Sequence, residues 1–234
     1  MKKASSEVIE YSSDGKTLEL PLEDGTVYSP RKGICPTSNP FSTHSLKEYI
    51  PFIGEEEAGK IEDLARELKG VKILELNSTA IGGGVAEMLY SSVPFLNNIG
   101  LENEWKVIKG TGPYYEVTKN IHNTLQGKEC CFSPEMEEIY FSTVRENAAA
   151  NIIDWDPDVV IVHDPQPLGL ATYLKKKRQT WFWRCHIDIE DTLIEGSALW
   201  DFINILTKDY DAVVFSMAHY IVARWPIYSF IIPP

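Results

Sequence analysis

The sequence lacks most of the features that would place it in a special class of protein. It has four cysteines among 234 residues and no Cys-x-x-Cys pair, and the adjacent Cys130 and Cys131 suit neither a structural disulfide nor a zinc knuckle. No stretch approaches the ~20 apolar residues of a membrane span, and residues 1–13 have no apolar core of a signal peptide. We therefore expect reduced thiols and a cytoplasmic protein.

Positive charge is also scarce. The chain holds 22 Lys and Arg against 34 Asp and Glu, and its formal net charge is −12. Proteins that bind nucleic acids or membrane surfaces cluster Lys and Arg on one face. The basic run at residues 175–178 is better explained as the solvated end of a helix. The sequence therefore predicts no nucleic acid and no membrane as a partner.

Several catalytic signatures are missing as well. No set of His, Cys, Asp and Glu has the spacing of a metal site, and no Gly-x-Ser-x-Gly elbow presents a serine nucleophile. The turn Gly82–Gly84 continues as Val85, Ala86 and Glu87, which does not fit the Gly-x-Gly-x-x-Gly fingerprint, and no Lys follows as in a Walker loop. A nucleotide-binding oxidoreductase is therefore disfavoured, and neither a metal nor a resident cofactor is expected.

What the sequence does contain is an alternation of strand and helix patterns. Predicted strands lie at 71–76, 102–110, 159–162, 180–185, 212–215 and 229–232, and predicted helices at 55–70, 85–99, 114–127, 134–154, 168–174, 198–206 and 218–223. Such alternation predicts an α/β fold with a doubly wound, Rossmann-like parallel sheet, which we expect over residues 45–234. Turn signals at 13–15 and 23–25 predict that residues 1–44 form an accessory hairpin or meander with a connector.

Three polar segments follow predicted strands. They are Gly82–Gly84, His163–Pro167 and Arg184–Asp188. Ligands of parallel sheets bind outside the carboxyl ends of the strands, so we expect these segments to meet at one edge. Three glycines at a helix start let backbone N–H groups approach an anionic ligand, although a glycine triplet is equally compatible with a plain tight turn.

Each polar candidate also has a structural explanation. His163 and Asp164 could hydrogen-bond sugar hydroxyls, or Asp164 could cap the next helix. Strand alternation puts Arg184, His186 and Asp188 on one face, as a ligand site or as a buried ion pair. A third group, His122, Asn123 and Gln126, lies on one stretch of helix that is either ligand-binding or simply solvated.

Four motifs carry a resemblance to a known family. LNSTAIGGGVAEML, VTKNIHNTLQG, VHDPQP and WFWRCHID, in this order, resemble the N-terminal domain of trehalose glycosyltransferring synthases and the related trehalose phosphorylases. These are retaining glycosyltransferases of the two-domain type called GT-B. The resemblance covers about residues 71–234 and leaves residues 1–44 outside.

The resemblance implies transfer of glucose from a nucleoside diphosphate glucose to glucose, which gives trehalose. It implies that the donor lies against Gly82, Gly83 and Gly84, and that His186 is the catalytic residue that contacts the donor sugar and stabilises developing charge. The residues that it suggests for acceptor binding are Asp164, Gln166, Arg184, Asp188, His122, Asn123 and Gln126.

The family carries a second Rossmann domain that binds most of the nucleotide, and this sequence ends where the linker to that domain begins. We therefore expect an acceptor-side half that is incompetent alone. Its expected partners are glucose, the nucleotide sugar, and a separate C-terminal half or a second copy of the chain. The alternative is a non-catalytic carbohydrate-binding or regulatory module on the same fold.

Overall fold

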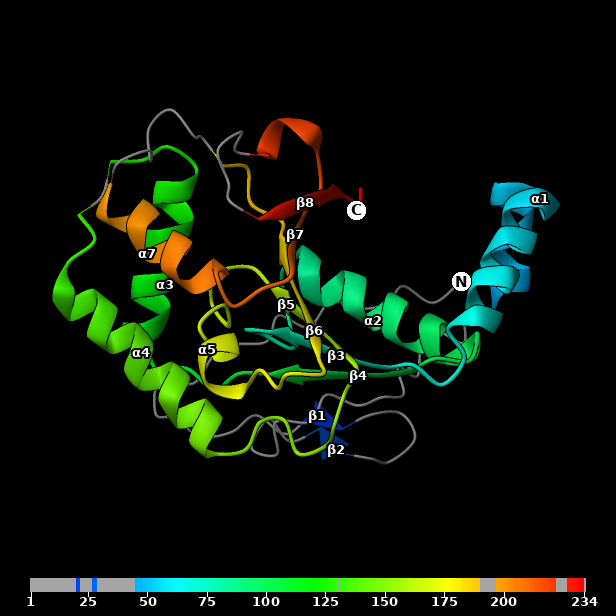
Figure 1. Cartoon of the computed structure of the whole chain (residues 1–234), viewed down its shortest axis with the longest axis horizontal. Helices are drawn as coiled ribbons and strands as arrows, with labels where there is room; N and C mark the ends of the chain where they lie inside the picture. The colour runs from blue at the N-terminus through cyan, green and yellow to red at the C-terminus, as the bar shows by residue number, and fades with distance from the viewer. Residues whose placement is uncertain are drawn as a thin grey trace.

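A computed structural model of the chain describes residues 20–21, 27–28, 45–129, 131–189, 197–221 and 227–233. Its centre is a six-stranded parallel sheet with the order β4 (Glu102–Val107), β3 (Lys72–Asn77), β5 (Val159–His163), β6 (Thr180–Cys185), β7 (Ala212–Phe215) and β8 (Tyr228–Ile231) (Figure 1). The α helices are α1 (Leu46–Glu67), α2 (Gly84–Asn98), α3 (Gly112–Leu125), α4 (Pro134–Ala149), α5 (Leu170–Leu174) and α7 (Ala198–Thr207), and η2 (Ala218–Tyr220) is a 3₁₀ helix. The predicted doubly wound α/β fold is confirmed.

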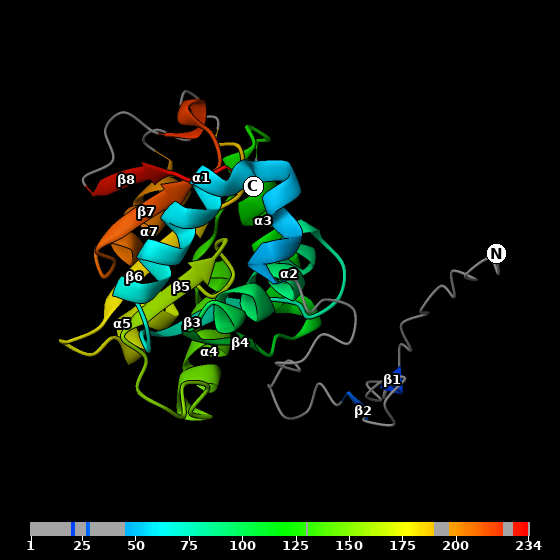
Figure 2. The same ribbon diagram turned by 90° about the vertical axis from the view of Figure 1, so that its right-hand side faces the viewer.

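The two faces of the sheet are covered unequally. Figures 1 and 2 show α3, α4, α5 and α7 on one side and α2 with α1 on the other. On the first side, residues of four strands are fully buried against those helices, among them Leu74, Val160, Trp181 and Trp183. Fully burying a large apolar side chain contributes about 1.5–3 kcal/mol to the stability of the fold. Because more such side chains are buried here than on the other side, this side is the main core. A smaller cluster joins α2 to Trp105 of β4 on the other side.

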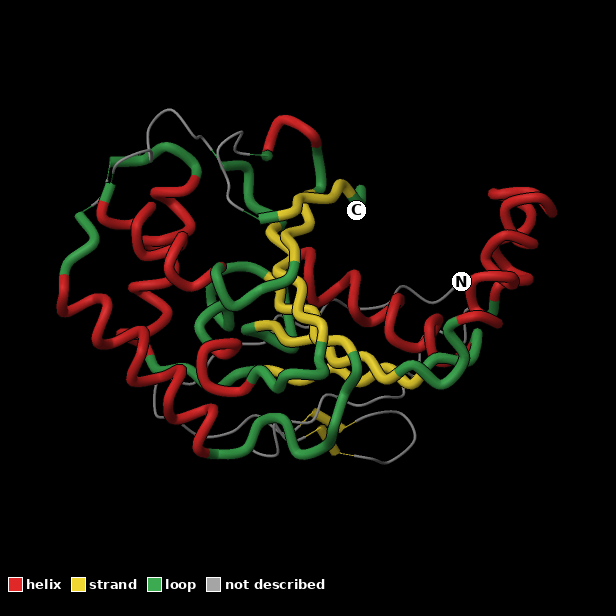
Figure 3. The backbone as a smooth tube through the Cα atoms, viewed as in Figure 1, coloured by secondary structure: helices red, strands yellow, loops and turns green. Residues whose placement is uncertain are grey.

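The strand order reverses between β3 and β5. The chain passes from β3 to β4 on one side and then returns to place β5 on the other side of β3. Figure 3 shows the strands (yellow) between helices (red) on both sides. At such a switch point the connections leave in opposite directions, so a crevice opens at the carboxyl ends of the two strands. The glycine turn follows β3 there, and His163 ends β5.

Several predicted boundaries differ from those of the structure. Helix α1 starts at Leu46, ahead of the predicted residue 55, and Pro51 and the non-helical Gly54 (φ 82°) lie inside it. Helix α4 ends at Ala149, short of the predicted residue 154. The helix predicted at 218–223 is a 3₁₀ helix over Ala218–Tyr220, and its last two predicted residues lie outside the described part of the chain.

Only a small part of the predicted accessory segment is described. Strands β1 (Leu20–Pro21) and β2 (Val27–Tyr28) pair antiparallel, with Leu20 opposite Tyr28. This pairing agrees with a hairpin around the predicted turn at 23–25. The other residues of the segment 1–44 lie outside the described residues, so the proposed division into domains stays a prediction.

Aromatic side chains hold the loop after β5 by its backbone. The hydroxyl of Tyr140 donates to the carbonyl of Pro165 (2.8 Å) and accepts from the N–H of Gly169 (2.9 Å). Three more such bonds run from Tyr114 to the carbonyl of Gln166, from the Trp183 indole to the carbonyl of Asp164, and from Tyr210 to the carbonyl of Leu168. Hydrogen bonds from buried aromatic side chains therefore fix the backbone conformation of the loop that carries Asp164.

We expect Tyr140→Phe to lower the free energy of unfolding by about 2 kcal/mol, because the ring stays packed while two buried backbone groups lose their partner. The measurement is urea unfolding followed by tryptophan fluorescence. The control is Tyr228→Phe, since Tyr228 is 80% exposed. Equal midpoints for both variants would show that the hydroxyl does not hold the loop.

Candidate functional site

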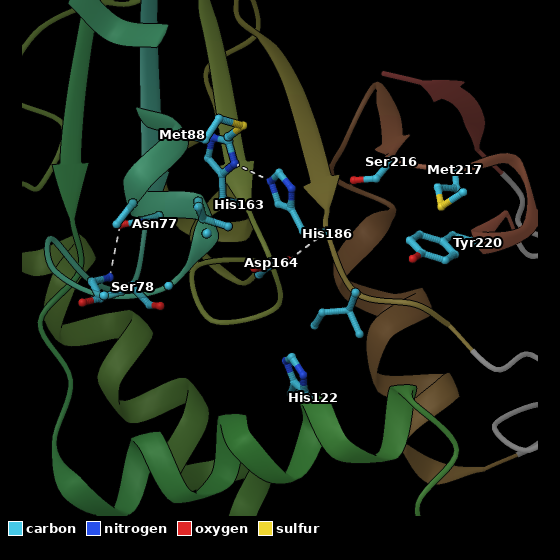
Figure 4. A pocket seen from close by; sticks show the side chains of 17 residues that line it. Asn77, Ser78, Met88, His122, His163, Asp164, His186, Ser216, Met217 and Tyr220 are labelled. Atoms are coloured by element: carbon cyan, nitrogen blue, oxygen red, sulfur yellow. Dashed lines mark hydrogen bonds between the residues drawn. The ribbon is translucent and has the colours of Figure 1, made fainter. Parts of the chain in front are cut away.

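A pocket of about 520 Å³ opens at the carboxyl edge of the sheet, at the switch point. Figure 4 shows His163 and His186 side by side in it, with His122 of α3 facing them from across the pocket. The lining comes from Asn77 at the end of β3 and Ser78 and Thr79 after it, from Gly82–Ala86 and Met88 at the start of α2, from His122, from His163 and Asp164, from His186 and Ile187, and from Ser216, Met217 and Tyr220 after β7. The predicted convergence of strand ends therefore produces one cavity.

The glycine turn presents bare backbone to this pocket. Gly82 and Gly83 have φ values of 76° and 87°, which other residues adopt at a cost. No heavy atom lies within 4 Å of where a Cβ would stand at Gly82, Gly83 or Gly84, so the space beside them is open. Helix α2 begins at Gly84, and the N–H groups of a first helical turn lack partners within the helix. The turn can therefore receive an anionic group.

Asp164 is held in an unusual backbone conformation. Its φ is 61°, a left-handed value that Asp and Asn tolerate better than most residues. Its Oδ1 accepts the backbone N–H of His186 (2.9 Å). Burial raises the pKa of the Asp164 carboxyl above its ordinary value, although that N–H, His163 and His122 act in the opposite direction. Asp164 does not cap α5, which begins after Gly169 without a side-chain cap.

His186 belongs to a chain of buried hydrogen bonds. Its Nε2 lies 2.9 Å from Nδ1 of His163 (Figure 4). Nε2 of His163 in turn lies 2.7 Å from a carboxylate oxygen of Glu75 in β3. The side chains of His163 and Glu75 are 1% and 5% exposed. Burial, with smaller contributions from His163 and Arg184, lowers the pKa of His186 to about 3. His186 is therefore a neutral imidazole at physiological pH.

The structure brings some of the predicted site residues together and not others. Gly82–Gly84, His122, Asp164 and His186 line the pocket. The other candidates, Gln166, Arg184, Asp188, Asn123 and Gln126, are not part of its lining, and Asp188 and Gln126 are exposed. Their contacts with an acceptor stay predictions.

Two of these outlying candidates have buried polar atoms that find no partner among the described residues. They are Oε1 of Gln166 and Nε of Arg184. Burial lowers the pKa of the half-buried Arg184, while the charge of Glu75 raises it. The guanidinium of Arg184 is thus electrostatically coupled to Glu75. No ion pair between Arg184 and Asp188, the alternative raised from the sequence, occurs in the described part of the structure.

Sequence reasoning missed Glu75 and the residues after β7. Glu75 is an acidic residue within an otherwise apolar strand and is 4% exposed, and that contrast is the signal that could have found it. Ser216, Met217 and Tyr220 carry no motif, and only the sheet order brings them to the pocket.

Two negative findings apply to the described residues. Among them, no group of three or more His, Cys, Asp and Glu side chains could hold a metal ion. In the same part of the chain, no helix has the length and apolar character needed to cross a membrane.

Comparison with known proteins identifies the family. The family model described as "Trehalose synthase, N-terminal domain" matches residues 75–222, which include every segment that lines the pocket. The chain belongs to this family. The resemblance inferred from the four motifs is therefore confirmed, and it covers the site as well as the fold.

The curated relatives of the chain are trehalose synthases and trehalose phosphorylases. The chain is 43% identical over 178 residues to a trehalose synthase of Pyrococcus horikoshii, covering 75% of this chain and 41% of the relative. It is 38% identical over 181 residues to a trehalose synthase of Rubrobacter xylanophilus, covering 75% and 42%. A trehalose phosphorylase of Pleurotus pulmonarius is 32% identical over 162 residues, covering 64% and 22%.

The chain thus spans about two fifths of the length of the trehalose synthases that it matches. Among solved structures, the N-terminal domain of Candida albicans trehalose-6-phosphate phosphatase overlaps with 69% of this chain and 48% of its own, at a TM-score of 0.47 and 10% identity. That likeness is too weak to say anything about activity.

The low pKa of His186 predicts that the stability of this protein is sensitive to acid. The unfolded chain binds a proton on this ring below pH ~6.5, whereas the folded chain binds it only near the pKa of about 3. The free energy of unfolding should therefore fall between these pH values, by up to about 1.4 kcal/mol per pH unit. Asp164, whose pKa is raised, acts in the opposite direction, so the comparison must be made between variants.

We expect His186→Gln to show a smaller pH slope than the wild type between pH 6.5 and pH 4. The measurement is urea unfolding at half-unit pH steps. His219→Gln, which changes an exposed histidine, serves as the control and should keep the wild-type slope. Identical slopes for all three proteins would contradict a buried, neutral His186.

Proposed function

We propose that this chain forms the acceptor-side half of a retaining glucosyltransferase that makes trehalose from a nucleoside diphosphate glucose and glucose. The observation that carries the proposal is the pocket itself. In it Asp164, His122 and His186 lie opposite an open glycine turn at the start of α2. Membership of the trehalose synthase N-terminal domain family supports the choice of sugars.

The donor is proposed to lie against the glycine turn. The empty space beside Gly82–Gly84 would let a diphosphate approach the backbone closely. The first turn of α2 presents N–H groups and the positive end of the helix dipole, both of which favour negative charge. Asn77 supports the turn, since its Oδ1 accepts from the backbone N–H of Thr79 (3.1 Å) and from the Trp105 indole (3.2 Å).

The acceptor is proposed to be an unphosphorylated hexose. Asp164 provides a carboxylate, and His122 and His186 provide imidazole nitrogens, which suit the hydroxyls of a sugar. The described lining contains no Lys and no Arg that would pair with a sugar phosphate. The carboxylate of Asp164 would repel a phosphate as well. We therefore favour free glucose over its phosphate esters as the acceptor.

The chemistry supported by these residues is transfer with retention and without a protein nucleophile. Asp164 is the one carboxylate in the described lining, and one of its oxygens is already bonded to the backbone of His186. A neutral His186 cannot neutralise the charge of another group, but it can form a hydrogen bond with the reacting sugar. Departure of the diphosphate from the face that the acceptor attacks fits this arrangement.

Cations for the departing diphosphate must come from elsewhere. A diphosphate leaving group needs positive charge near it, and the described lining supplies helix N–H groups but no Lys or Arg. The proposal therefore includes a nucleotide-binding half that acts together with this chain. The same lack of cations favours the second candidate function, a non-catalytic carbohydrate-binding or regulatory module.

A transfer assay separates the two functions. The full chain is incubated with glucose and a panel of nucleoside diphosphate glucoses, with and without the nucleotide-binding half of a trehalose synthase. We expect no trehalose from the chain alone and trehalose when that half is added. Trehalose from the chain alone would show that it is competent by itself. Glucose binding without trehalose in either mixture would favour the non-catalytic module.

Asp164→Asn tests acceptor binding without disturbing the fold. Asn keeps an oxygen for the His186 N–H and tolerates the left-handed backbone, but it loses the charge. A hydrogen bond to a charged group contributes about 1 kcal/mol more than a neutral one, so glucose should bind about 5- to 10-fold more weakly. Isothermal titration measures this, with Asp201→Asn, an exposed carboxylate of α7, as the matched control. An unchanged affinity in Asp164→Asn would remove Asp164 from the acceptor site.

A further inference from the structure

Glu75 lies in a position where a charge is costly. It is the fourth residue of β3, it pairs in register with Ile161 and Trp105, and it is 4% exposed. Burying a carboxylate costs several kcal/mol of desolvation, and an apolar side chain of similar volume often serves stability as well or better. The burial of Glu75 therefore calls for an explanation beyond packing.

The hydrogen bonds of Glu75 lead to the pocket. Its Oε2 lies 2.7 Å from Nε2 of His163, and Nδ1 of His163 lies 2.9 Å from Nε2 of His186. The two rings are nearly parallel, with centroids 5.2 Å apart and an interplanar angle of 14°. His186 lines the pocket, whereas Glu75 does not. The three side chains connect the middle of β3 to the ligand space through β5 and β6.

The direction of these bonds follows from the chemistry of the three groups. A carboxylate can only accept, so Nε2 of His163 must carry the proton that it donates to Glu75. In a neutral His163 this leaves a lone pair on Nδ1, which accepts from Nε2–H of His186. A neutral His186 then has its lone pair on Nδ1. That nitrogen has no hydrogen-bond partner among the described residues.

We propose that Glu75 is a positioning residue: acting through His163, it fixes His186 in the Nε2–H tautomer, so that Nδ1 of His186 accepts a hydrogen bond from a ligand hydroxyl. The identity of that ligand as a sugar rests on the proposed function, whereas the tautomer does not. Without Glu75, His163 can place its proton on Nδ1 and donate to His186. His186 would then turn a donor toward the ligand in place of an acceptor.

The other charged and titratable groups nearby do not set this direction. Arg184, on the strand that leads to His186, and His163 both disfavour a charged His186 ring. Asp164 accepts a hydrogen bond from the backbone N–H of His186, and not from the imidazole ring. His122 of α3 interacts electrostatically with Asp164. Among the described residues, Glu75 is the one acceptor-only group that is hydrogen-bonded into the pair of rings.

The test compares histidine tautomers in the full chain. Two-bond ¹H–¹⁵N correlation spectra distinguish Nε2–H from Nδ1–H, and the five histidines can be assigned by single substitutions. In the wild type we expect the Nε2–H tautomer for both His163 and His186. Glu75→Gln should keep it only in part, because the amide can either accept from or donate to His163, whereas Glu75→Met should give a substantial Nδ1–H population of His186.

Glucose titration of the same proteins gives a second readout. Loss of the acceptor should weaken binding about five- to tenfold in Glu75→Met, and the affinity of Glu75→Gln should lie between those of the wild type and Glu75→Met. A merely structural role would lower the stability of Glu75→Met without changing the tautomer. If the wild type binds no glucose, the proposed function fails, and the tautomers still decide the role of Glu75.

Two results would overturn the inference. One is a wild-type His186 that carries its proton on Nδ1. This measurement uses the wild-type protein, so it does not depend on whether a variant folds. The other is a folded Glu75→Met whose His186 keeps the wild-type tautomer.

Discussion

The pocket depends on how the backbone of the loop after β5 is satisfied. A strand that ends in a buried loop leaves N–H and C=O groups without a neighbouring strand, and each such group costs about 1–3 kcal/mol if it stays unpaired. Here the hydroxyls of Tyr114, Tyr140 and Tyr210 and the indole of Trp183 take the place of that strand. Because these rings bond to the backbone of the loop, the side chains of His163 and Asp164 can bond to His186 and line the pocket.

The polar contacts that start from this loop fasten three neighbouring strands at their functional ends. Asp164 holds the backbone of His186 after β6, and His163 bonds to the ring of His186 and to Glu75 of β3. A network of this kind is costly unless every member has its partners. Its members therefore depend on one another, and the geometry of the site is set by the β3–β5–β6 register rather than by a flexible loop.

The sequence predicted the fold well because the sheet pattern is local. An apolar run such as Val159–Val162 and a glycine turn can each be recognised within ten residues, and position at a strand end then predicted that Asp164 and His186 would meet. Helix α1 is longer than predicted because it continues through Pro51 and Gly54, residues that normally end a helix and here lie at a kink. The partner of Glu75 is 88 residues away, so no local pattern could reveal that bond.

Under the proposed function, the charge of the pocket bears on how donor and acceptor binding are divided between this chain and a nucleotide-binding half. A site that gathers an anionic diphosphate and a neutral sugar needs cations near the former and hydrogen-bonding groups without excess charge near the latter. The described lining offers a carboxylate, neutral imidazole and backbone N–H groups, which serve the sugar and tolerate the phosphate without neutralising it. Strong donor binding on this side alone would need Lys or Arg beside the acceptor, where Asp164 would pair with them and lose its contact with the sugar. Under the proposed function, separating the cations from the acceptor pocket would keep both contacts intact, and the full set of charges would assemble only when donor and acceptor are bound together.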